Sequence, residues 1–252
     1  MLPLSSAVRP VAESDDVWEK FLPSDYKEIL SRLVSPVMFS SKKELFHRLC
    51  NQRLMDEGRK SFALERSSGG KSFILSAKEL QITWGNDPMY WSWNSIPESR
   101  FPKVAELRTM YWLEITGKLS TRTLSPNTNY RVYMIVKISN RAYGLDTMPS
   151  EVSVRVGNRV TNGTVYLHCG DISKQKMNCS FGLNGIHDST SEVRGNEKSM
   201  IQREDGWMEI ELGEFFRGED NEEVKMSLKE VKGYHLKGGL IVEGIEVRPM
   251  II

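Results

Sequence analysis

The 252-residue chain has little cysteine and no long hydrophobic run. Its three cysteines, Cys50, Cys169 and Cys179, are odd in number and far apart, which argues against a disulfide framework. No apolar run approaches the about 18 residues that a membrane-spanning helix needs, and the first residues lack the basic and apolar regions of a secretory signal. These absences predict a protein of the cytoplasm or nucleus with no membrane partner.

The chain also lacks an excess of either charge and the motifs of common enzymes. Its 34 basic and 33 acidic residues give a net charge of +1, so charge does not indicate a nucleic-acid partner. There is no Gly-x-Ser-x-Gly elbow, no His-Glu-x-x-His helix and no phosphate-cradling glycine loop. His168 and His187 lie near two of the cysteines, but not in the close pairs typical of zinc sites. We therefore expect a non-enzyme without catalytic residues, metal or cofactor.

Aromatic residues, by contrast, are concentrated in one stretch. Residues 82–93 hold three of the six tryptophans and a tyrosine, interleaved with Gly, Asn, Asp and Pro. Turn formers beside flat rings are typical of a loop that presents rings to a ligand, and a sugar has a matching apolar face and polar rim. The alternative is that the rings fill the end of a β-sandwich core. The stretch by itself leaves these two hypotheses level.

The hydrophobic pattern changes near residue 58. Before it, apolar residues recur at helical spacing over 17–22, and Pro23 ends that helix. A capping-box pattern that begins at Ser41 predicts a second helix over about 42–50. Neither helix can bury its apolar face alone, so both need a partner surface.

Beyond residue 57, hydrophobic residues alternate with polar ones at the period of two expected for strands. Many short strands separated by Gly, Pro and Asn turns favour an antiparallel β-sandwich over βαβ units. The sequence thus predicts a short α-helical segment over residues 1–57 and a mainly β domain over 58–252. The strand candidates lie at 62–64, 73–75, 113–115, 130–138, 152–156, 165–167, 208–212, 224–228 and 241–247.

Three finer predictions concern the β domain. A second capping-box pattern at Ser76 predicts one helical turn before the aromatic stretch. Trp112 and Trp207 lie inside strand candidates, so we expect both in the core. Residues 157–199 are rich in Gly, Asn and Ser with one clear strand signal, Thr164 to His168, so we expect mostly a long loop or hairpin extension.

Several separate blocks, in order along residues 60–249, carry a family resemblance. They are Leu-Gln-Ile-Thr-Trp-Gly at 80–85, Pro-Met-Tyr-Trp-Ser-Trp at 88–93, Ala-Glu-Leu at 105–107, Trp-Leu-Glu-Ile-Thr-Gly-Lys at 112–118, and the long blocks at 203–216 and 239–249. Together they resemble the phloem protein 2-like domain of plants, the domain of tobacco-agglutinin-type lectins. The resemblance implies a jelly-roll β-sandwich that binds glycans, typically N-acetylglucosamine oligomers or the cores of N-linked glycans.

The resemblance also implies which residues bind the sugar. Trp84 and Trp91 match the family's sugar-binding rings, and each could stack on the C–H face of a pyranose for ~1 kcal/mol, by analogy with aromatic pairs. Neighbouring side chains would hydrogen-bond the hydroxyl rim, and one further ring would share the strand face of Trp91. These neighbours are Asn86, Asp87 and Tyr90, and the further ring is Trp93.

Residues 11–23 resemble the second half of a plant F-box, which commonly precedes this lectin domain. In such proteins the F-box docks on the Skp adaptor of a cullin ubiquitin ligase while the lectin domain recruits the target. We expect adaptor binding to be impaired here, because residues 1–10 cannot supply the opening helices of the motif.

Two functions remain open from the sequence. The first is a lectin that binds glycans or glycoproteins through exposed tryptophans. The second is a ligase substrate receptor, or a protein-interaction module that has lost sugar binding. Exposure of Trp84 and Trp91 on one face would favour the first, and burial of both would favour the second.

Overall fold

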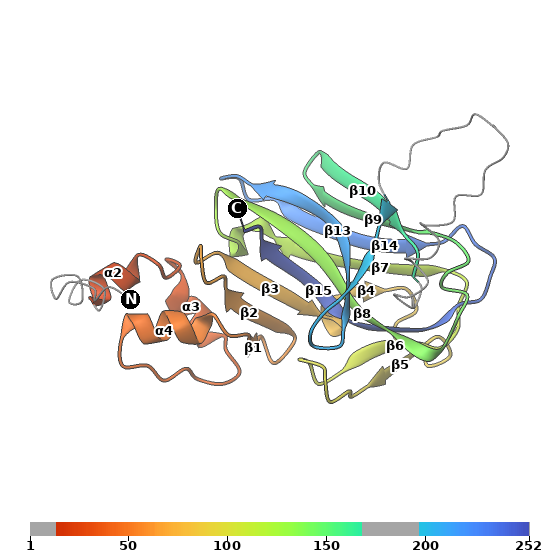
Figure 1. The fold of residues 1–252 in the computed structure, drawn as a ribbon, viewed down its shortest axis with the longest axis horizontal. Helices are drawn as coiled ribbons and strands as arrows, with labels where there is room; N and C mark the ends of the chain where they lie inside the picture. Colours follow the sequence, from red (N-terminus) through yellow and green to blue (C-terminus); the bar gives the residue numbers. More distant parts are fainter. Residues whose placement is uncertain (1–13, 168–196, 252) are drawn as a thin grey trace, which may run out of the picture.

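The computed structural model describes residues 14–167 and 197–251 (Figure 1). These residues form short helices followed by two β-sheets, which confirms the predicted mainly β fold with a helical start. Within the described residues, every strand pair is antiparallel except the short one between Arg159–Val165 and Glu197–Lys198, which is parallel.

The larger sheet has nine strands, and the longest of them is the one predicted over 130–138. Its strands are β1 (Arg53–Met55), β2 (Lys60–Leu64), β3 (Lys71–Ser76), β5 (Trp91–Asn94), β6 (Val104–Leu107), β8 (Thr128–Tyr143), β12 (Met200–Gln202), β13 (Met208–Arg217) and β15 (Gly238–Pro249). They follow the order β1-β2-β3-β15-β8-β13-β12, and β6 joins β5 to β15.

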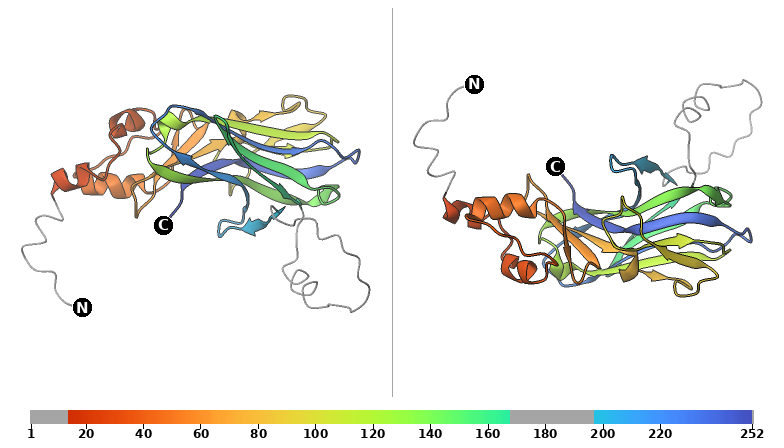
Figure 2. Two further views of the ribbon diagram at one scale, coloured as in Figure 1. Left: turned by 90° about the horizontal axis from the view of Figure 1, so that it is seen from above. Right: turned by 90° about the horizontal axis from the view of Figure 1, so that it is seen from below.

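The smaller sheet has six strands and lies against the first (Figure 2). Its strands are β4 (Gln81–Ile82), β7 (Leu113–Ser120), β9 (Ser150–Val156), β10 (Arg159–Val165), β11 (Glu197–Lys198) and β14 (Glu223–Glu230). They follow the order β11-β10-β9-β14-β7-β4.

One hydrophobic core fills the space between the two sheets. Val132, Met134 and Val136 of β8 and Val152 and Val154 of β9 belong to the same buried cluster. Their period of two places all of them on the inner faces, where each buried side chain of this size contributes about 1.5–3 kcal/mol. The alternation read from the sequence therefore identifies the inner face of each sheet.

The helical segment comprises α2 (Asp15–Glu19), α3 (Tyr26–Ser31) and α4 (Lys42–Leu49), at one end of the long axis in Figure 1. Helix α4 confirms the second predicted helix, and Ser41 caps it by accepting a hydrogen bond from the Glu44 amide at 3.2 Å. The first helix ends at Glu19, four residues before Pro23, and α3 was not predicted as a separate helix. Leu22 of the helical segment is buried in the same core as the strands.

An ion pair also joins the helical segment to the sandwich. The Lys71 ammonium at the start of β3 lies 2.9 Å from the Asp25 carboxylate at the N-terminus of α3, and the lysine is 6% exposed. The predicted boundary between residues 57 and 58 falls in the turn between β1 and β2, so the first strand of the larger sheet precedes it. The helices and the sandwich therefore form one packed body.

The finer predictions have mixed outcomes. The helical turn before the aromatic stretch is confirmed as a 3₁₀ turn at Ala77–Glu79, and Trp207 is fully buried. The core prediction for Trp112 is wrong: its side chain is 39% exposed and its Nε1 donates to Glu114 Oε2 at 3.2 Å. Trp112 and Glu114 are two residues apart, so the strand direction places both on the outer face.

The long loop or hairpin extension predicted over residues 157–199 begins as a hairpin, and its second strand starts earlier than the predicted one at Thr164 to His168. Strand β10 begins at Arg159, directly after a two-residue turn in which Gly157 has a φ of +55°. Gly-Asn at such a turn favours a β-hairpin, so a signal was present in the sequence. Residues 168–196, with His168, Cys169, Cys179 and His187, lie outside the described residues.

Candidate functional site

The aromatic stretch forms a tight loop between β4 and β5. The Gly85 amide donates to the Ile82 carbonyl at 2.9 Å, and the Asp87 amide donates to the Trp84 carbonyl at 2.9 Å. The Asp87 carboxylate accepts the Met89 amide at 2.9 Å. Because successive turns close on themselves, the loop holds its side chains in fixed directions before any ligand arrives.

Trp84 is the most unusual residue of this loop. Its φ is +53°, in the left-handed region that a bulky residue rarely adopts, and such strain costs about 1–3 kcal/mol. Its indole is 43% exposed and lies 4.9 Å from the Tyr90 ring and 6.3 Å from the Tyr111 ring, between ring centroids. Trp84, Tyr90 and Tyr111, which we call the aromatic platform, present flat rings from two different loops.

Trp91 and Trp93 hold the loop from the strand side. The prediction of an exposed Trp91 is wrong, because its side chain is 2% exposed and its Nε1 donates to the Thr83 carbonyl at 3.1 Å. The Trp93 Nε1 donates in the same way to the Gly85 carbonyl at 2.8 Å. The two rings share one face of β5, as predicted, and that face is turned toward the backbone of the loop.

A lysine covers the ring of Trp93. The Lys78 ammonium lies 3.4 Å from the ring centroid, a distance at which a cation is attracted to the indole face. Burial lowers the pKa of Lys78, and repulsion by Lys103 lowers it further. This face of Trp93 is therefore already occupied by a protein cation.

Polar groups surround the aromatic platform. Asn86 is exposed, and its side-chain amide makes no hydrogen bond with the part of the chain that the structure describes. Asp87 uses Oδ1 for the turn, which leaves Oδ2 without a hydrogen bond to described residues. The Tyr90 hydroxyl also makes no hydrogen bond to described residues. The rim of the platform therefore offers hydrogen-bond donors and acceptors to a polar ligand.

Tyr111 is the platform residue that the sequence analysis missed. It is 49% exposed and lies in the connection between β6 and β7. The Arg108 amide of this connection donates to the Tyr90 carbonyl at 2.8 Å, which fixes the two loops against each other. No local pattern in the sequence indicated this role, because Tyr111 and Trp112 are both exposed and the contact of Tyr111 with Trp84 joins two separate loops.

The site has no features of a metal centre or a membrane anchor within the described ranges. Among residues 14–167 and 197–251, no three His, Cys, Asp or Glu side chains are grouped so that they could hold a metal ion. In the same ranges, no helix has the length and apolar character needed to cross a bilayer.

Comparison with known proteins gives consistent matches over nearly the whole chain. The family model described as phloem protein 2 matches residues 70–249. F-box protein PP2-B15 of Arabidopsis thaliana is 50% identical over 98% of this chain and 88% of its own length. F-box proteins PP2-B13 and VBF of the same plant are 47% and 45% identical, each over 98% of this chain and 90% of its own length.

Proposed function

The chain belongs to the phloem protein 2 family, as an F-box protein of the PP2 type, and from this premise we propose that its sandwich binds glycans through the aromatic platform. The observation that carries the proposal is the exposed Trp84 indole, held at a strained φ of +53° between two tyrosines. Strain of this kind persists only where the surroundings enforce it, and it is concentrated at binding and catalytic sites.

The platform suits the chemistry of a pyranose ring. The C–H face of the sugar stacks on Trp84, and Tyr111 borders the same surface at 61° to the indole plane. Asn86, Asp87 and the Tyr90 hydroxyl then hydrogen-bond the sugar hydroxyls and set the orientation. We propose N-acetylglucosamine oligomers or the cores of N-linked glycans as ligands, and a binding role in the cytoplasm or nucleus without catalysis.

In this proposal Trp91 and Trp93 support the sugar site without touching the sugar. Their indole N–H groups hold the Thr83 and Gly85 carbonyls on either side of Trp84. Substitution of the buried Trp91 by Ala would remove a core ring, with an expected loss of about 3–5 kcal/mol of stability. Such a variant would confuse loss of binding with loss of folding, so it is a poor test of the site.

The test is a glycan-array screen of the full chain beside Trp84→Ala, Tyr111→Ala and, as a control, Trp112→Ala. We expect binding to N-acetylglucosamine oligomers that weakens about tenfold in Trp84→Ala, equivalent to ~1.4 kcal/mol. The control removes an indole of similar exposure that bonds Glu114 and does not belong to the platform, so it should bind as the parent does.

A fourth variant, Trp84→Gly, separates binding from folding. Glycine accepts a positive φ without strain, so this variant should be about 1 kcal/mol more stable than Trp84→Ala while it also loses glycan binding. Full glycan binding by Trp84→Gly or Trp84→Ala would contradict the proposal, as would the absence of binding to every glycan by the parent chain.

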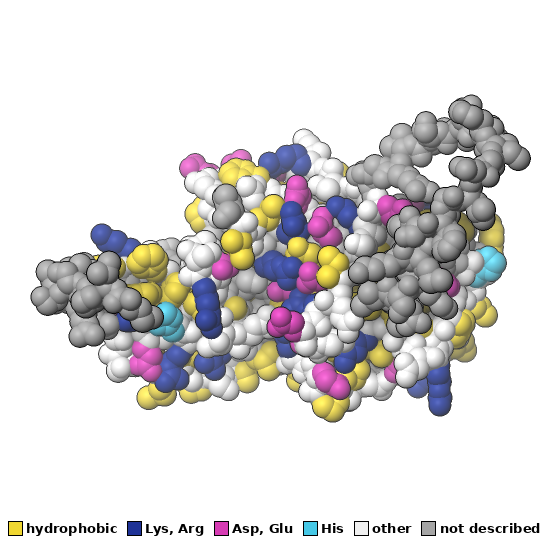
Figure 3. Space-filling view, viewed as in Figure 1, with side chains coloured by type: hydrophobic (Ala, Val, Ile, Leu, Met, Phe, Trp, Pro, Cys, Tyr) yellow, Lys and Arg dark blue, Asp and Glu magenta, His cyan; other side chains and the backbone are white. Residues whose placement is uncertain are grey.

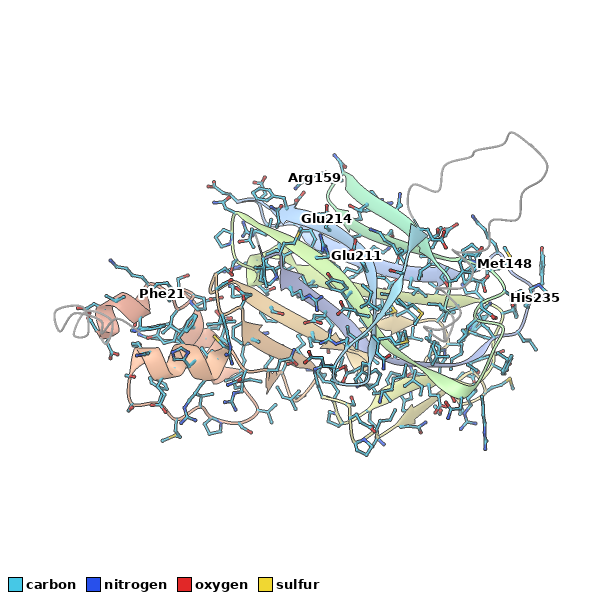
Figure 4. All side chains as sticks on the ribbon, in the orientation of Figure 1. Phe21, Met148, Arg159, Glu211, Glu214 and His235 are labelled. Carbon is cyan, nitrogen blue, oxygen red and sulfur yellow. The ribbon has the colours of Figure 1, made fainter. Side chains whose placement is uncertain are left out.

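A second candidate function is adaptor docking by the helical segment. The relatives carry the name F-box protein, and the described helical segment exposes large apolar side chains, among them Met38 at 77%. The others are Phe21, which Figure 4 places at the helical end of the molecule, Val34 and Phe39. Exposed apolar groups gathered on one small segment are typical of a protein-binding surface. We propose a Skp adaptor of a cullin ubiquitin ligase as the partner.

Adaptor docking is tested by co-purification of a Skp adaptor with the full chain and with the double variant Met38→Ser, Phe39→Ser. We expect the double variant to lose the adaptor and to keep glycan binding, since the changed residues lie on the helical segment. Met89→Ser, which alters an exposed methionine of the aromatic loop, is the matched control and should keep the adaptor. Adaptor capture that is equal in all three chains would contradict this second function.

A further inference from the structure

The outer face of the six-stranded sheet carries a polar groove remote in sequence from the aromatic platform. A cavity of about 630 Å³ lies over β9, β10 and β14, within the size range of ordinary small-ligand sites. It is formed by a difference in side-chain length, because a row of short polar residues runs between two rows of long charged ones. The groove therefore follows directly from strand register.

The floor of the groove is a row of neutral polar side chains. Ser153 lies opposite Asn162 of β10 on one side and opposite Ser227 of β14 on the other. The Ser153 and Ser227 hydroxyl oxygens are 2.8 Å apart. Hydroxyl and amide groups can both donate and accept hydrogen bonds, which is what a ligand rich in hydroxyl groups requires.

One wall of the groove is basic, and two of its cations form no close ion pair with described residues. Arg155 of β9 lies directly opposite Lys225 of β14, and Lys225 lies opposite Lys118 of β7. Like charges in directly opposed positions of a sheet destabilise it. Lys118 pairs with Glu223 at 3.2 Å, but Arg155 and Lys225 make no hydrogen bond or ion pair with any residue that the structure describes.

The opposite wall has its charges paired. The Lys229 ammonium lies 2.7 Å from Glu114, and the Glu151 carboxylate lies 2.5 Å from Lys232. These pairs leave little net charge on that side. The groove therefore combines a hydroxyl-binding floor with two cations along one edge that form no close ion pair, although the charge of Lys225 also helps to lower the pKa of Glu114.

We propose that this groove binds an acidic saccharide, a sugar chain that carries a carboxylate or a sulfate ester. The sugar hydroxyls contact Ser153, Ser227 and Asn162, and the anionic group pairs with Arg155 and Lys225. The anion would relieve the repulsion between those two cations, which gives the binding its driving force.

Other classes of ligand fit the groove less well. None of the groove-lining residues is aromatic, so nucleic-acid bases have no ring on which to stack. The groove also lies on the face of a sheet, whereas an added peptide strand needs a free edge. The proposal does not depend on the glycan site at Trp84, because the two sites share no residue.

The test is isothermal titration calorimetry of the full chain with trigalacturonate and with a sulfated N-acetylglucosamine trimer. The neutral controls are the methyl ester of trigalacturonate and the unsulfated N-acetylglucosamine trimer. We expect at least one acidic form to bind and its affinity to fall with added salt, because the charges lie at the surface. Which acid binds distinguishes a sugar carboxylate from a sulfate ester.

Arg155→Gln and Lys225→Gln should each weaken that binding about tenfold while the melting temperature stays equal or rises. Arg141→Gln makes the same change of charge on β8 of the other sheet and should bind as the parent does. A purely structural role for the basic wall would instead lower the melting temperature of both groove variants.

Four outcomes would overturn the proposal. Neutral and acidic trimers could bind equally, or neither acid could bind. Binding could also be lost in Trp84→Ala and kept in Arg155→Gln, which would assign the acid to the aromatic platform. A single-stranded oligonucleotide that binds the groove more tightly than both acidic trimers would replace the saccharide by a nucleic acid.

Discussion

The outer faces of the two sheets use charged residues in opposite ways. On the nine-stranded sheet, the Arg203 guanidinium lies 3.0 Å from Glu209 and 2.7 Å from Glu246, and Arg248 pairs with the same two carboxylates at 3.0 and 3.4 Å. Figure 3 shows basic and acidic side chains intermingled over the middle of this face. On the six-stranded sheet, Arg155 lies opposite Lys225, and neither forms an ion pair with a carboxylate of the described residues.

The pKa shifts show how strongly acidic and basic groups stabilise each other on the outer face of the nine-stranded sheet, which we call the balanced face. Burial alone would lower the pKa of Arg248, but Glu209 and Glu246 outweigh it and raise that pKa. The same two carboxylates, with Asp205, raise the pKa of Arg203 against burial. Figure 4 places Glu211 and Glu214 along β13 on the same face, where both lie near Arg131. Charges that are balanced within the fold stabilise it, whereas unbalanced charges beside an open groove remain available to a ligand.

The largest expected effect comes from breaking the balanced face. Glu246→Ala leaves Arg248 with Glu209 alone and Arg203 with Glu209 and Asp205 in a mostly buried setting, so we expect a loss of about 3 kcal/mol, the low end for a broken buried pair. Glu151→Ala removes the exposed partner of Lys232 on the other sheet and should change stability by less than about 0.5 kcal/mol. Urea unfolding of both variants measures the difference, and equal losses would remove the distinction between the two faces.

Acid should weaken the balanced face through Asp205. Burial raises the pKa of Asp205, but the Trp207 amide and the charges of Arg203 and Arg100 together hold it below its usual 3.8. The folded state therefore binds fewer protons than the unfolded state, and the carboxylate stabilises the fold above about pH 4. This stability is lost as the pH falls through the lowered pKa.

Asp205→Asn tests that linkage. We expect it to lower the free energy of unfolding by about 1 kcal/mol at pH 7, as for a partly exposed ion pair, and by much less at pH 2.5. Unfolding curves of the variant and the parent at both pH values provide the comparison. If the two free energies of unfolding differed as much at pH 2.5 as at pH 7, the ionised form of Asp205 would not be the source of the stabilisation.

A smaller effect is expected on the floor of the groove. Ser227→Ala removes a nearly buried hydroxyl that bonds Ser153, so stability should fall by about 0.5 kcal/mol. The double variant with Ser153→Ala should lose less than the sum of the two single losses, because the hydroxyls share one hydrogen bond. Strict additivity in thermal unfolding would show that the two hydroxyls act independently.

The smallest expected effect has the opposite sign. Lys225→Gln relieves the repulsion by Arg155 and should raise stability by a few tenths of a kcal/mol at low salt, with a smaller gain at 1 M salt. Lys229→Gln, four residues along the same strand, loses its pair with Glu114 and should lower stability instead. If both variants were destabilised, other groups of the protein would already stabilise the positive charge of Lys225, and no ligand would be needed to do so.

Much of the fold could be predicted from local pattern. The period of two identified β8, β9, β13, β14 and β15, and the capping box at Ser41 located helix α4. The hairpin between β9 and β10 was predicted only as an alternative to a long loop, although Gly157 and its neighbour Asn158 form a turn signal.

The candidate site could be predicted only in part. The punctuation of residues 82–93 correctly indicated a loop, and the family resemblance, not the punctuation, pointed to an exposed ring at Trp84. The same pattern could not show that Trp91 faces inward, because a period of two says only that Trp91 and Trp93 share a face. The divided outcome, one ring exposed and the other buried, matched neither of the two simple alternatives. Tyr111 could not be assigned to the platform because it comes from another loop.

The sequence by itself determined the local structure: short helices before the sandwich, alternating strands, and a turn-rich aromatic loop. These features depend on spacing and turn residues within a few positions of one another. Only the tertiary structure decided which rings face solvent and that Arg155 lies opposite Lys225. Those outcomes depend on the pairing and register of strands far apart in sequence, and no local pattern contains that information.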